Sequence, residues 1–261
     1  MTISTTKNNS AIKYVLKTAF SKLSTLILVT FVCLLFWDVA ALLVNNSYFL
    51  PTVKETLFAL KKLLSNEGFF KTILISLSRV AVGLISGITA GVILATVSHK
   101  LRFLNAFISA VISIMKATPV AAIILILWFT FTDASLAVFV VFLMVTPIVW
   151  QNVYDGYKTI SKEMLEVCRV FELPYKRKFM LLILPTILRY LIPAVITAIG
   201  LAWKAEIAAE IMTYSNIGRS IQDFKSLHYD TASVFAWAVV IVVLSLILEN
   251  IAKYLLRRIK I

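Results

Sequence analysis

The sequence predicts an all-α integral membrane protein with about six transmembrane helices. Of its 261 residues, 60% are hydrophobic and 15% are charged, and the mean hydropathy is +0.92, whereas about a quarter of the residues in a soluble domain are charged. The apolar residues form runs of about 20, the length that a helix needs to cross a bilayer. The 26 Lys and Arg residues exceed the 13 acids, but they gather in short clusters between the runs. This distribution is typical of topology determinants and argues against nucleic-acid binding.

The first part of the chain is predicted to be a cytoplasmic tail, a membrane span and an outer loop. Residues 1–24 are polar and contain four lysines and no acid. Residues 25–44 are apolar except for Asp38, and the run is longer than the apolar core of a signal peptide, so we expect an uncleaved span. Residues 45–71 carry mixed charges and Pro51, which indicates an outer loop with a short helix.

Residues 72–257 are predicted to form the core domain, and 258–261 a short basic cytoplasmic tail. The spans of the core domain are expected at about 72–97, 103–132, 135–153, 186–205 and 231–256. Together with the first span they make six and place both ends of the chain in the cytoplasm. The loops assigned to the inside then carry most of the Lys and Arg, in agreement with the positive-inside rule.

Two spans contain residues that predict particular packing. Gly83, Gly87 and Gly91 recur every four residues in the second span, so they share one helix face and let a neighbouring helix approach closely. In the third span, Pro119 removes a backbone donor and crowds the carbonyl four residues earlier, so we expect a kink or break there. Lys116, close to this kink, is expected to reach the inner headgroups.

The segment 161–185 is the longest charged interruption of the core domain and is cytoplasmic by this topology. Ser161 is a suitable N-cap, and Pro174 is suited to end one helix and open another, so we expect two short helices joined by a turn. An apolar face is expected on the first helix, formed by Met164, Leu165, Val167, Cys168 and Phe171. Because this face should not enter lipid, it favours docking to a partner over a solvated connector.

This segment resembles the coupling segment of binding-protein-dependent ABC importer permeases, the EAA loop. The family form is roughly E-A-A, three residues, G, nine residues and I-x-L-P. Here Glu166, Val167 and Cys168 stand at the E-A-A positions, Glu172 stands at the glycine position, and the closing motif is matched by Leu182, Leu184 and Pro185. Four further stretches, 76–87, 116–129, 200–211 and 215–221, resemble the subgroup that imports nitrate, sulfonates, taurine, bicarbonate or thiamine and riboflavin precursors.

Glu172 is the main departure from the family form. Glycine at this position would permit a positive φ, which is unfavourable for other residues. We expect Leu173 and Pro174 to make the turn instead, which would leave Glu172 without a positive φ.

The resemblance implies a permease with the type I (MetI-like) fold in the bacterial inner membrane, with residues 72–257 as the permease core. It implies a homodimer with a second copy, two ABC ATP-binding subunits beneath it, and an extracytoplasmic solute-binding protein. The coupling residues would be Glu163, Glu166, Val167, Cys168, Phe171, Glu172, Leu184 and Pro185. ATP and Mg²⁺ would belong to the ATPase. This chain has no Gly-rich Lys-Ser/Thr phosphate loop, and we expect neither a cofactor nor enzymatic activity.

Several residues within the spans are candidates for lining the solute path. They are Arg79, Pro119, Trp128, Trp203, Glu206 and Glu210. Two interpretations stay open for the two glutamates, which share a helix face: they pair with other helices near the outer interface, or they line the path. Arg79 is expected to form a structural ion pair, and the two tryptophans are equally compatible with packing or an interfacial belt.

Two other classes of function compete with the permease. In an ion-coupled secondary transporter, Arg79, Glu206 and Glu210 would be the coupling groups, but the inverted repeats that would support this are not visible in the sequence. A membrane enzyme would need a cluster of His, Asp, Ser or Cys at one depth, and neither this nor metal-ligand spacing is present. By resemblance the substrate is a small anion such as nitrate, a sulfonate, taurine or bicarbonate, or a vitamin precursor; the residues themselves do not choose.

Overall fold

The computed structural model describes residues 24–25 and 28–258, which are helical apart from short connections. The predicted N-terminal tail, except Ser24, and residues 259–261 lie outside the described residues. The elements after the first helix, Leu28–Val44, are α2 (Val53–Leu64), α3 (Phe69–Lys100), α4 (Arg102–Ala117), α5 (Val120–Trp128), α6 (Asp133–Lys158), α7 (Lys162–Val170), α8 (Tyr175–Lys178), the π-helical turn η1 (Phe179–Ile183), α9 (Leu184–Thr213), α10 (Asn216–Ser226) and α11 (Thr231–Arg257).

Four described helical stretches are long and apolar enough to span a membrane: α3, α6, α11 and the continuous stretch Tyr175–Thr213 made by α8, η1 and α9. The α4–α5 pair passes the same test as one unit that is bent by 96°, so the predicted break at Pro119 is confirmed. The helix Leu28–Val44 is apolar but shorter. The predicted count of six is therefore met only approximately among the described residues.

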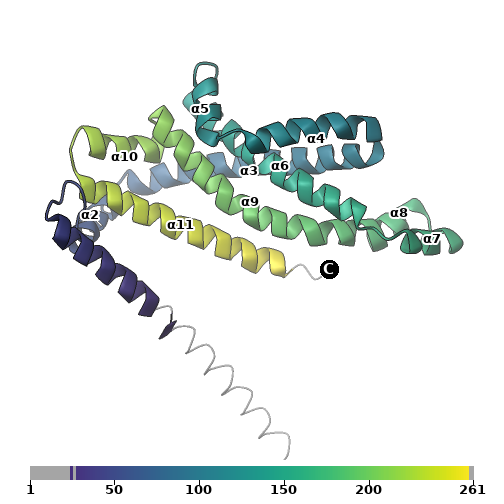
Figure 1. Ribbon diagram of the computed structural model, residues 1–261, viewed down its shortest axis with the longest axis horizontal. Helices are drawn as coiled ribbons and strands as arrows, with labels where there is room; N and C mark the ends of the chain where they lie inside the picture. The colour runs from purple at the N-terminus through teal and green to yellow at the C-terminus, as the bar shows by residue number, and fades with distance from the viewer. Residues whose placement is uncertain (1–23, 26–27, 259–261) are drawn as a thin grey trace, which may run out of the picture.

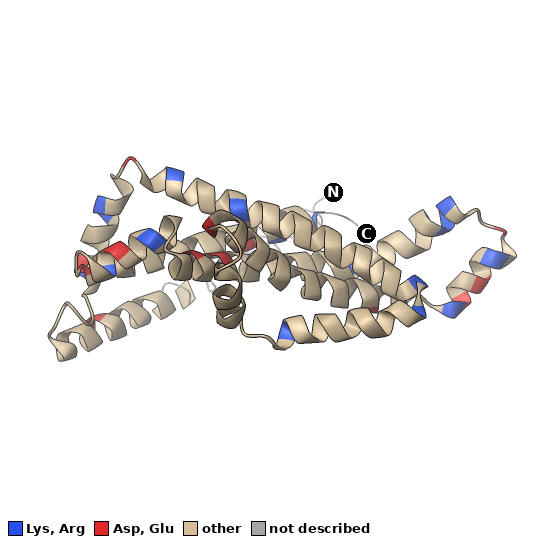
Figure 2. Ribbon diagram, turned by 90° about the horizontal axis from the view of Figure 1, so that it is seen from above, with Lys and Arg blue, Asp and Glu red and all other residues tan. Residues whose placement is uncertain are grey.

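Figure 1 shows α3, α6, α9 and α11 running along the long axis of the molecule. The α7–α8 hairpin lies at one end of this axis, and α2 and α10 lie at the opposite end. In Figure 2 the charged residues gather toward both ends, and α7 and α8 form a hairpin rich in both signs of charge. This arrangement separates the segment 161–185 from the loops on the other side of the apolar region.

The contact between α3 and α6 is made at the predicted glycine face. A Cβ atom added to Gly83, Gly87 or Gly91 would lie 2.6–2.8 Å from the Cβ of a facing valine of α6, Val141, Val145 or Val149 respectively. Real carbon atoms do not approach so closely, so the two helices can take this spacing only because the α3 positions lack side chains. The predicted packing role of the glycines is confirmed, and it agrees with close helix approach in lipid.

The predicted short helix of the outer loop is α2, and it has a complete capping box. Thr52 accepts a hydrogen bond from Glu55 N, while the Glu55 carboxylate accepts one from Thr52 N. That backbone bond, with hydroxyl bonds from Ser47 and Thr52, lowers the pKa of Glu55. Asp38, the acid of the first apolar run, accepts a hydrogen bond from Val53 N at 2.8 Å. Asp38 therefore ties the first helix to the start of α2.

Helix α9 extends further than the sequence predicts. The span was expected to end at residue 205 and to be followed by a polar outer segment, but α9 remains regular to Thr213 and stops at Tyr214, whose φ is 58°. The polar segment expected directly after residue 205 is therefore wrong, since Glu206 and Glu210 belong to the same helix as the predicted span. Both side chains are buried inside the bundle, and α3 supplies a polar group, the Ser76 hydroxyl, that binds Glu210.

Candidate functional site

The α7–α8 hairpin has the local structure that its sequence predicts. Ser161 caps α7 by accepting a hydrogen bond from Met164 N at 3.1 Å, and Pro174 stands directly before α8. The two helices and the intervening turn are therefore confirmed. Helix α8 is not a separate unit, however, since it passes through η1 directly into α9.

The predicted apolar face of α7 is exposed only in part, since one predicted member, Leu165, is half-buried and another, Cys168, is buried. Four apolar side chains face solvent in the described chain, and we call them the α7 apolar face: Met164, Val167, Val170 and Phe171. Val170 was missed, although its spacing of three from Val167 places both on one side. Cys168 is only 8% exposed, so its assignment to a docking face is wrong; it lies on the side of α7 that packs within the chain.

The other predicted coupling residues occupy two environments. Glu163, Glu166 and Glu172 are exposed along α7 and its turn, whereas Leu184 and Pro185 are partly buried in the first turn of α9. The hairpin thus brings the acids and the α7 apolar face together, and leaves the closing motif at the root of the long helix.

The turn after α7 contradicts the expectation for Glu172, whose φ is 46°. Leu173 N donates to Cys168 O and Glu172 N donates to Arg169 O, both at 3.0 Å. These two bonds define a Schellman motif, whose C′ residue is left-handed and is usually glycine. Pro174 does not relieve this demand, because the helix C-terminus needs the left-handed residue to satisfy its last carbonyls before the proline is reached.

Glu172→Gly is expected to stabilise the hairpin by about 1 kcal/mol, because glycine adopts a positive φ without the steric cost that a Cβ imposes. Thermal unfolding in detergent, followed by circular dichroism, would register a higher Tm. Glu172→Ala is the matched control, because it removes the carboxylate but keeps the Cβ. Equal Tm values for the two variants would show that the left-handed turn stores no strain.

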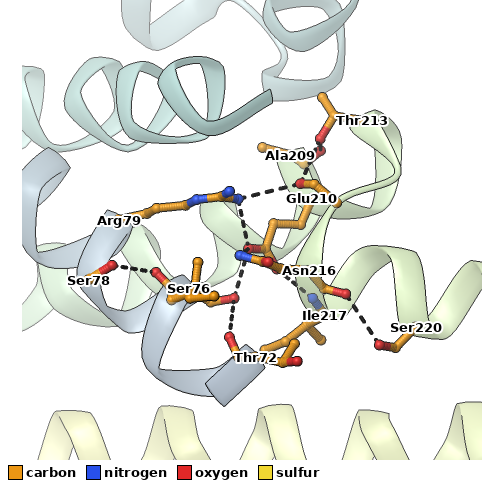
Figure 3. A network of polar contacts seen from close by, with 12 residues as sticks. Thr72, Ser76, Ser78, Arg79, Ala209, Glu210, Thr213, Asn216, Ile217 and Ser220 are labelled. Carbon is orange, nitrogen blue, oxygen red and sulfur yellow. Dashed lines mark hydrogen bonds and ion pairs between the residues drawn. The ribbon is translucent and has the colours of Figure 1, made fainter. Parts of the chain in front are cut away.

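A buried ion pair joins α3 to α9. Arg79 Nη1 lies 3.3 Å from Glu210 Oε1, the Glu210 side chain is fully buried and that of Arg79 is 15% exposed. Ser76, one turn before Arg79 on the same face of α3, donates to the same carboxylate oxygen at 2.7 Å. The predicted structural pairing of Arg79 is confirmed, and its partner is Glu210 (Figure 3).

Helix α10 completes the shell around Glu210. Asn216 Nδ2 donates to Oε1 at 3.1 Å, and Ile217 N donates to Oε2 at 3.2 Å (Figure 3). A Cβ on Gly218 would lie 2.0 Å from the carbonyl carbon of Glu210, so α10 begins in direct contact with the backbone of α9. The sequence showed Ser76 and Asn216 only as parts of two separate stretches, and nothing in it linked them to one carboxylate.

Glu206 lies one turn before Glu210 and is also fully buried. Neither carboxylate oxygen of Glu206 accepts a hydrogen bond from any residue that the structure describes. Lys204 is on the exposed side of α9, as its spacing from Glu206 predicts. The two glutamates thus share a face but differ in role, since only Glu210 is held by a set of donors.

The remaining path candidates are not part of this cluster. Trp203 is buried and donates its indole N–H to Ile241 O at 3.1 Å, which makes it a packing residue against α11. Pro119 stands at the α4–α5 break, and Trp128 is 43% exposed at the end of α5. No group of three His, Cys, Asp or Glu side chains that could hold a metal ion occurs among the described residues.

Comparison with known proteins identifies the family of the chain. Residues 87–261 match the model of the binding-protein-dependent transport system inner membrane component. The putative aliphatic sulfonates transport permease protein SsuC of Bacillus subtilis is 24% identical over 226 residues, 85% of this chain and 81% of that protein. The nitrate import permease protein NrtB of Synechococcus elongatus is 30% identical over 149 residues, 57% of this chain and 53% of that protein.

Solved structures show the same fold at low identity. An amino acid ABC transporter chain superposes with a TM-score of 0.62 at 14% identity, covering 71% of this chain and 91% of that one. A chain of the MetNI methionine ABC transporter in an inward-facing conformation gives a TM-score of 0.59 at 16% identity, covering 74% and 95%. Because the family model covers more than half of the sequence and the fold agrees, the chain belongs to the binding-protein-dependent transport system inner membrane component family, the permeases of ABC importers.

Proposed function

We propose that this permease is driven by a separate ATPase subunit that binds the α7–α8 hairpin, and that it carries a small anion. The observation that supports coupling is the α7 apolar face, on which Val170 is 79% and Phe171 72% exposed. Large apolar side chains at an exposed helix surface mark an interaction site. The names of the relatives, which refer to aliphatic sulfonates and nitrate, support an anionic solute.

The assembly that follows contains two copies of the chain, two ATP-binding subunits that hold ATP and Mg²⁺, and an external solute-binding protein. The hairpin end of the molecule faces the cytoplasm, together with both ends of the chain. In this orientation α2 and α10, at the opposite end (Figure 1), face the binding protein.

The connection from the hairpin to the membrane suits the transmission of movement. The stretch Tyr175–Thr213 is helical without interruption, and at 1.5 Å per residue its 39 residues extend for about 58 Å. It contains Lys204, Glu206 and Glu210. A displacement of the hairpin by an ATPase that closes on its nucleotide would therefore move the charged part of α9 directly, without an intervening loop to absorb it.

Val167→Arg is expected to weaken association with the ATPase about 30-fold or more, since it puts a charge at the centre of the docking face, where the few residues that contribute about 2 kcal/mol or more to binding are found. The measurement is the affinity of the purified permease in lipid nanodiscs for its ABC ATP-binding subunit. Lys162→Gln, on the other side of α7, is the matched control. Wild-type affinity in Val167→Arg would refute docking through this face.

ATP dependence separates this function from the ion-coupled alternative. In proteoliposomes that contain permease and ATPase, solute uptake is expected to require ATP and to persist when ion gradients are collapsed. Uptake by the permease alone, driven by an ion gradient, would instead indicate that Arg79, Glu206 and Glu210 act as coupling groups.

A further inference from the structure

A cavity of about 530 Å³ lies where the α4–α5 break meets α6 and α9. The break contributes Lys116, Thr118 and Pro119 to its wall, and α9 contributes Leu201 and Lys204. The remaining wall, from α4, α5, α6 and α9, is apolar and includes Met144, Pro147 and Ala208. The cavity is therefore an apolar pocket with a small number of polar groups, as is usual for sites that bind small molecules.

The titratable groups of this pocket are both cations. Lys116 and Lys204 are exposed in the described chain, and neither lies within 4.0 Å of a carboxylate of any described residue. No Asp or Glu lines the cavity. Glu206 belongs to the opposite, buried side of α9, so its carboxyl group is not directed into the pocket.

The position of Lys204 within a span candidate makes this exposure informative. Lys204 precedes Thr213, the end of the spanning stretch, by nine residues, which is about 14 Å of helix. A lysine inside a membrane span is costly against lipid and faces a water-filled cavity or another protein surface. The pocket that Lys204 lines provides such a surface, and it is positioned at the only described helix break within a span candidate.

The backbone at the α4–α5 break adds positive potential to that of the two lysines. Pro119 is the N-cap of α5, and α5 begins at Val120 with no side-chain cap. The first N–H groups of a helix have no acceptor within it and carry partial positive charge. The Thr118 hydroxyl does not cap these N–H groups. It donates to Ile114 O at 2.8 Å instead.

A second cavity, of about 620 Å³, lies between α3 and α6 and is lined by Arg79. The guanidinium of Arg79 already has a counter-ion, since it pairs with Glu210. The charge of Arg79 is thus largely neutralised inside the protein, whereas the two lysines at the α4–α5 break have no described counter-ion. The observations therefore favour the α4–α5 pocket as the anion site.

We propose that the pocket at the α4–α5 break is the anion-binding station of the permease, with Lys204 as the principal contact and Lys116 as a second cation. The ligand class is a small oxyanion such as nitrate, bicarbonate or an alkylsulfonate, whose hydrocarbon part would lie on the apolar wall. This inference rests on the proposed transport of an anion and assigns the residues that would select it. Alternate access to the station from the two sides of the membrane would follow from movement of α9 against α5.

The test uses the local electrostatic potential of the pocket and needs no knowledge of the natural solute. In the full-length permease in nanodiscs, Leu201→Cys places a thiol in the pocket wall; the background is Cys33→Ser, whose remaining thiol, the buried Cys168, is measured alone as the blank. Its reaction rates with an anionic and a cationic methanethiosulfonate reagent are measured, and each is divided by the rate of the same reagent with a free thiol. The ratio of the anionic to the cationic value is the anion preference of the site. Two cations at close range in a partly buried site are expected to favour the anionic reagent about tenfold or more.

Lys204→Gln in this background is expected to abolish most of the preference, and Lys204→Arg to retain it. Thr130→Cys, on the exposed loop after α5, is the control thiol, and its ratio should not respond to Lys204→Gln. Equal ratios for Leu201→Cys with and without Lys204→Gln would overturn the proposal.

Binding of nitrate, bicarbonate and ethanesulfonate to the same nanodiscs, measured calorimetrically at constant ionic strength, is expected to weaken at least about tenfold in Lys204→Gln. Undiminished binding would assign the anion to another site. The affinity for the ATPase is measured in parallel. Loss of anion preference with normal ATPase binding confirms the pocket. Normal anion selectivity without any ATPase binding in the wild type would refute the proposed coupling and leave the pocket standing.

Discussion

Arg79→Ala is expected to lower the free energy of unfolding by about 3–5 kcal/mol, the usual cost of leaving one member of a buried ion pair without its partner. Glu210 is fully buried and would retain bonds from Ser76, Asn216 and Ile217 N, but no positive charge. Titration of the detergent-solubilised protein with a denaturing detergent, followed by tryptophan fluorescence, measures the change.

A second substitution distinguishes lost charge balance from lost packing. Arg79→Ala combined with Glu210→Gln is expected to recover much of the stability, since it leaves no buried charge unpaired and the amide oxygen can still accept from Ser76 and Asn216, although the amide nitrogen cannot accept from Ile217 N. If the double variant were as unstable as the sum of the two single variants, the two residues would not interact energetically.

Gly218→Ala is expected to destabilise the protein by an amount at the upper end of the range of about 1–3 kcal/mol found for overpacked sites. The new methyl group would lie 2.0–2.2 Å from three backbone atoms of Glu210 and Ile211. No side-chain rotation relieves a clash with backbone. Helix α10 must therefore move away from α9, and the bond from Ile217 N to Glu210 is lost with it.

Gly68→Ala is the matched control for this change. A Cβ there would approach only the Asn66 side-chain oxygen, at 3.3 Å, so little effect on the unfolding transition is expected. Increased hydrogen exchange in residues 216–226 of Gly218→Ala would show that the damage is local to α10. An unfolding transition for Gly218→Ala equal to that of the wild type would contradict the tight contact between α9 and α10.

The membrane spans, the helix break and the helix cap were predictable because they depend on local chemistry. Runs of about 20 apolar residues define α3, α6 and α11. The break at Pro119 was predictable because proline lacks the N–H that the preceding turn requires, although Pro147 and Pro193 lie inside α6 and α9 without ending them. Ser161 caps α7 with its own hydroxyl, and the glycines of α3 share a face by spacing alone. Each of these features requires information from no more than a few neighbouring residues.

The partner of Arg79 was decided by tertiary structure alone. Arg79 and Glu210 are 131 residues apart and meet because the contacts of α3 with α9 bring them together. The length of α9 could not be found from hydropathy, which counts Glu206 and Glu210 as polar although Glu210 is satisfied by groups from α3 and α10. The left-handed Glu172 is a different case, since its φ is imposed locally by two carbonyls at the end of α7, and the glycine of the family form marks the same position.

The sequence by itself thus determined that this protein is a helical membrane protein of the ABC importer permease family, where its helices begin and break, and which hairpin carries an exposed apolar face. Tertiary structure decided which charges are neutralised and which stay free. Arg79 is neutralised by Glu210, whereas Lys116 and Lys204 line one cavity without a described counter-ion. The physical reason is that helix formation depends on each residue and its near neighbours, whereas the energy of a charge in a membrane depends on whatever group the fold places beside it.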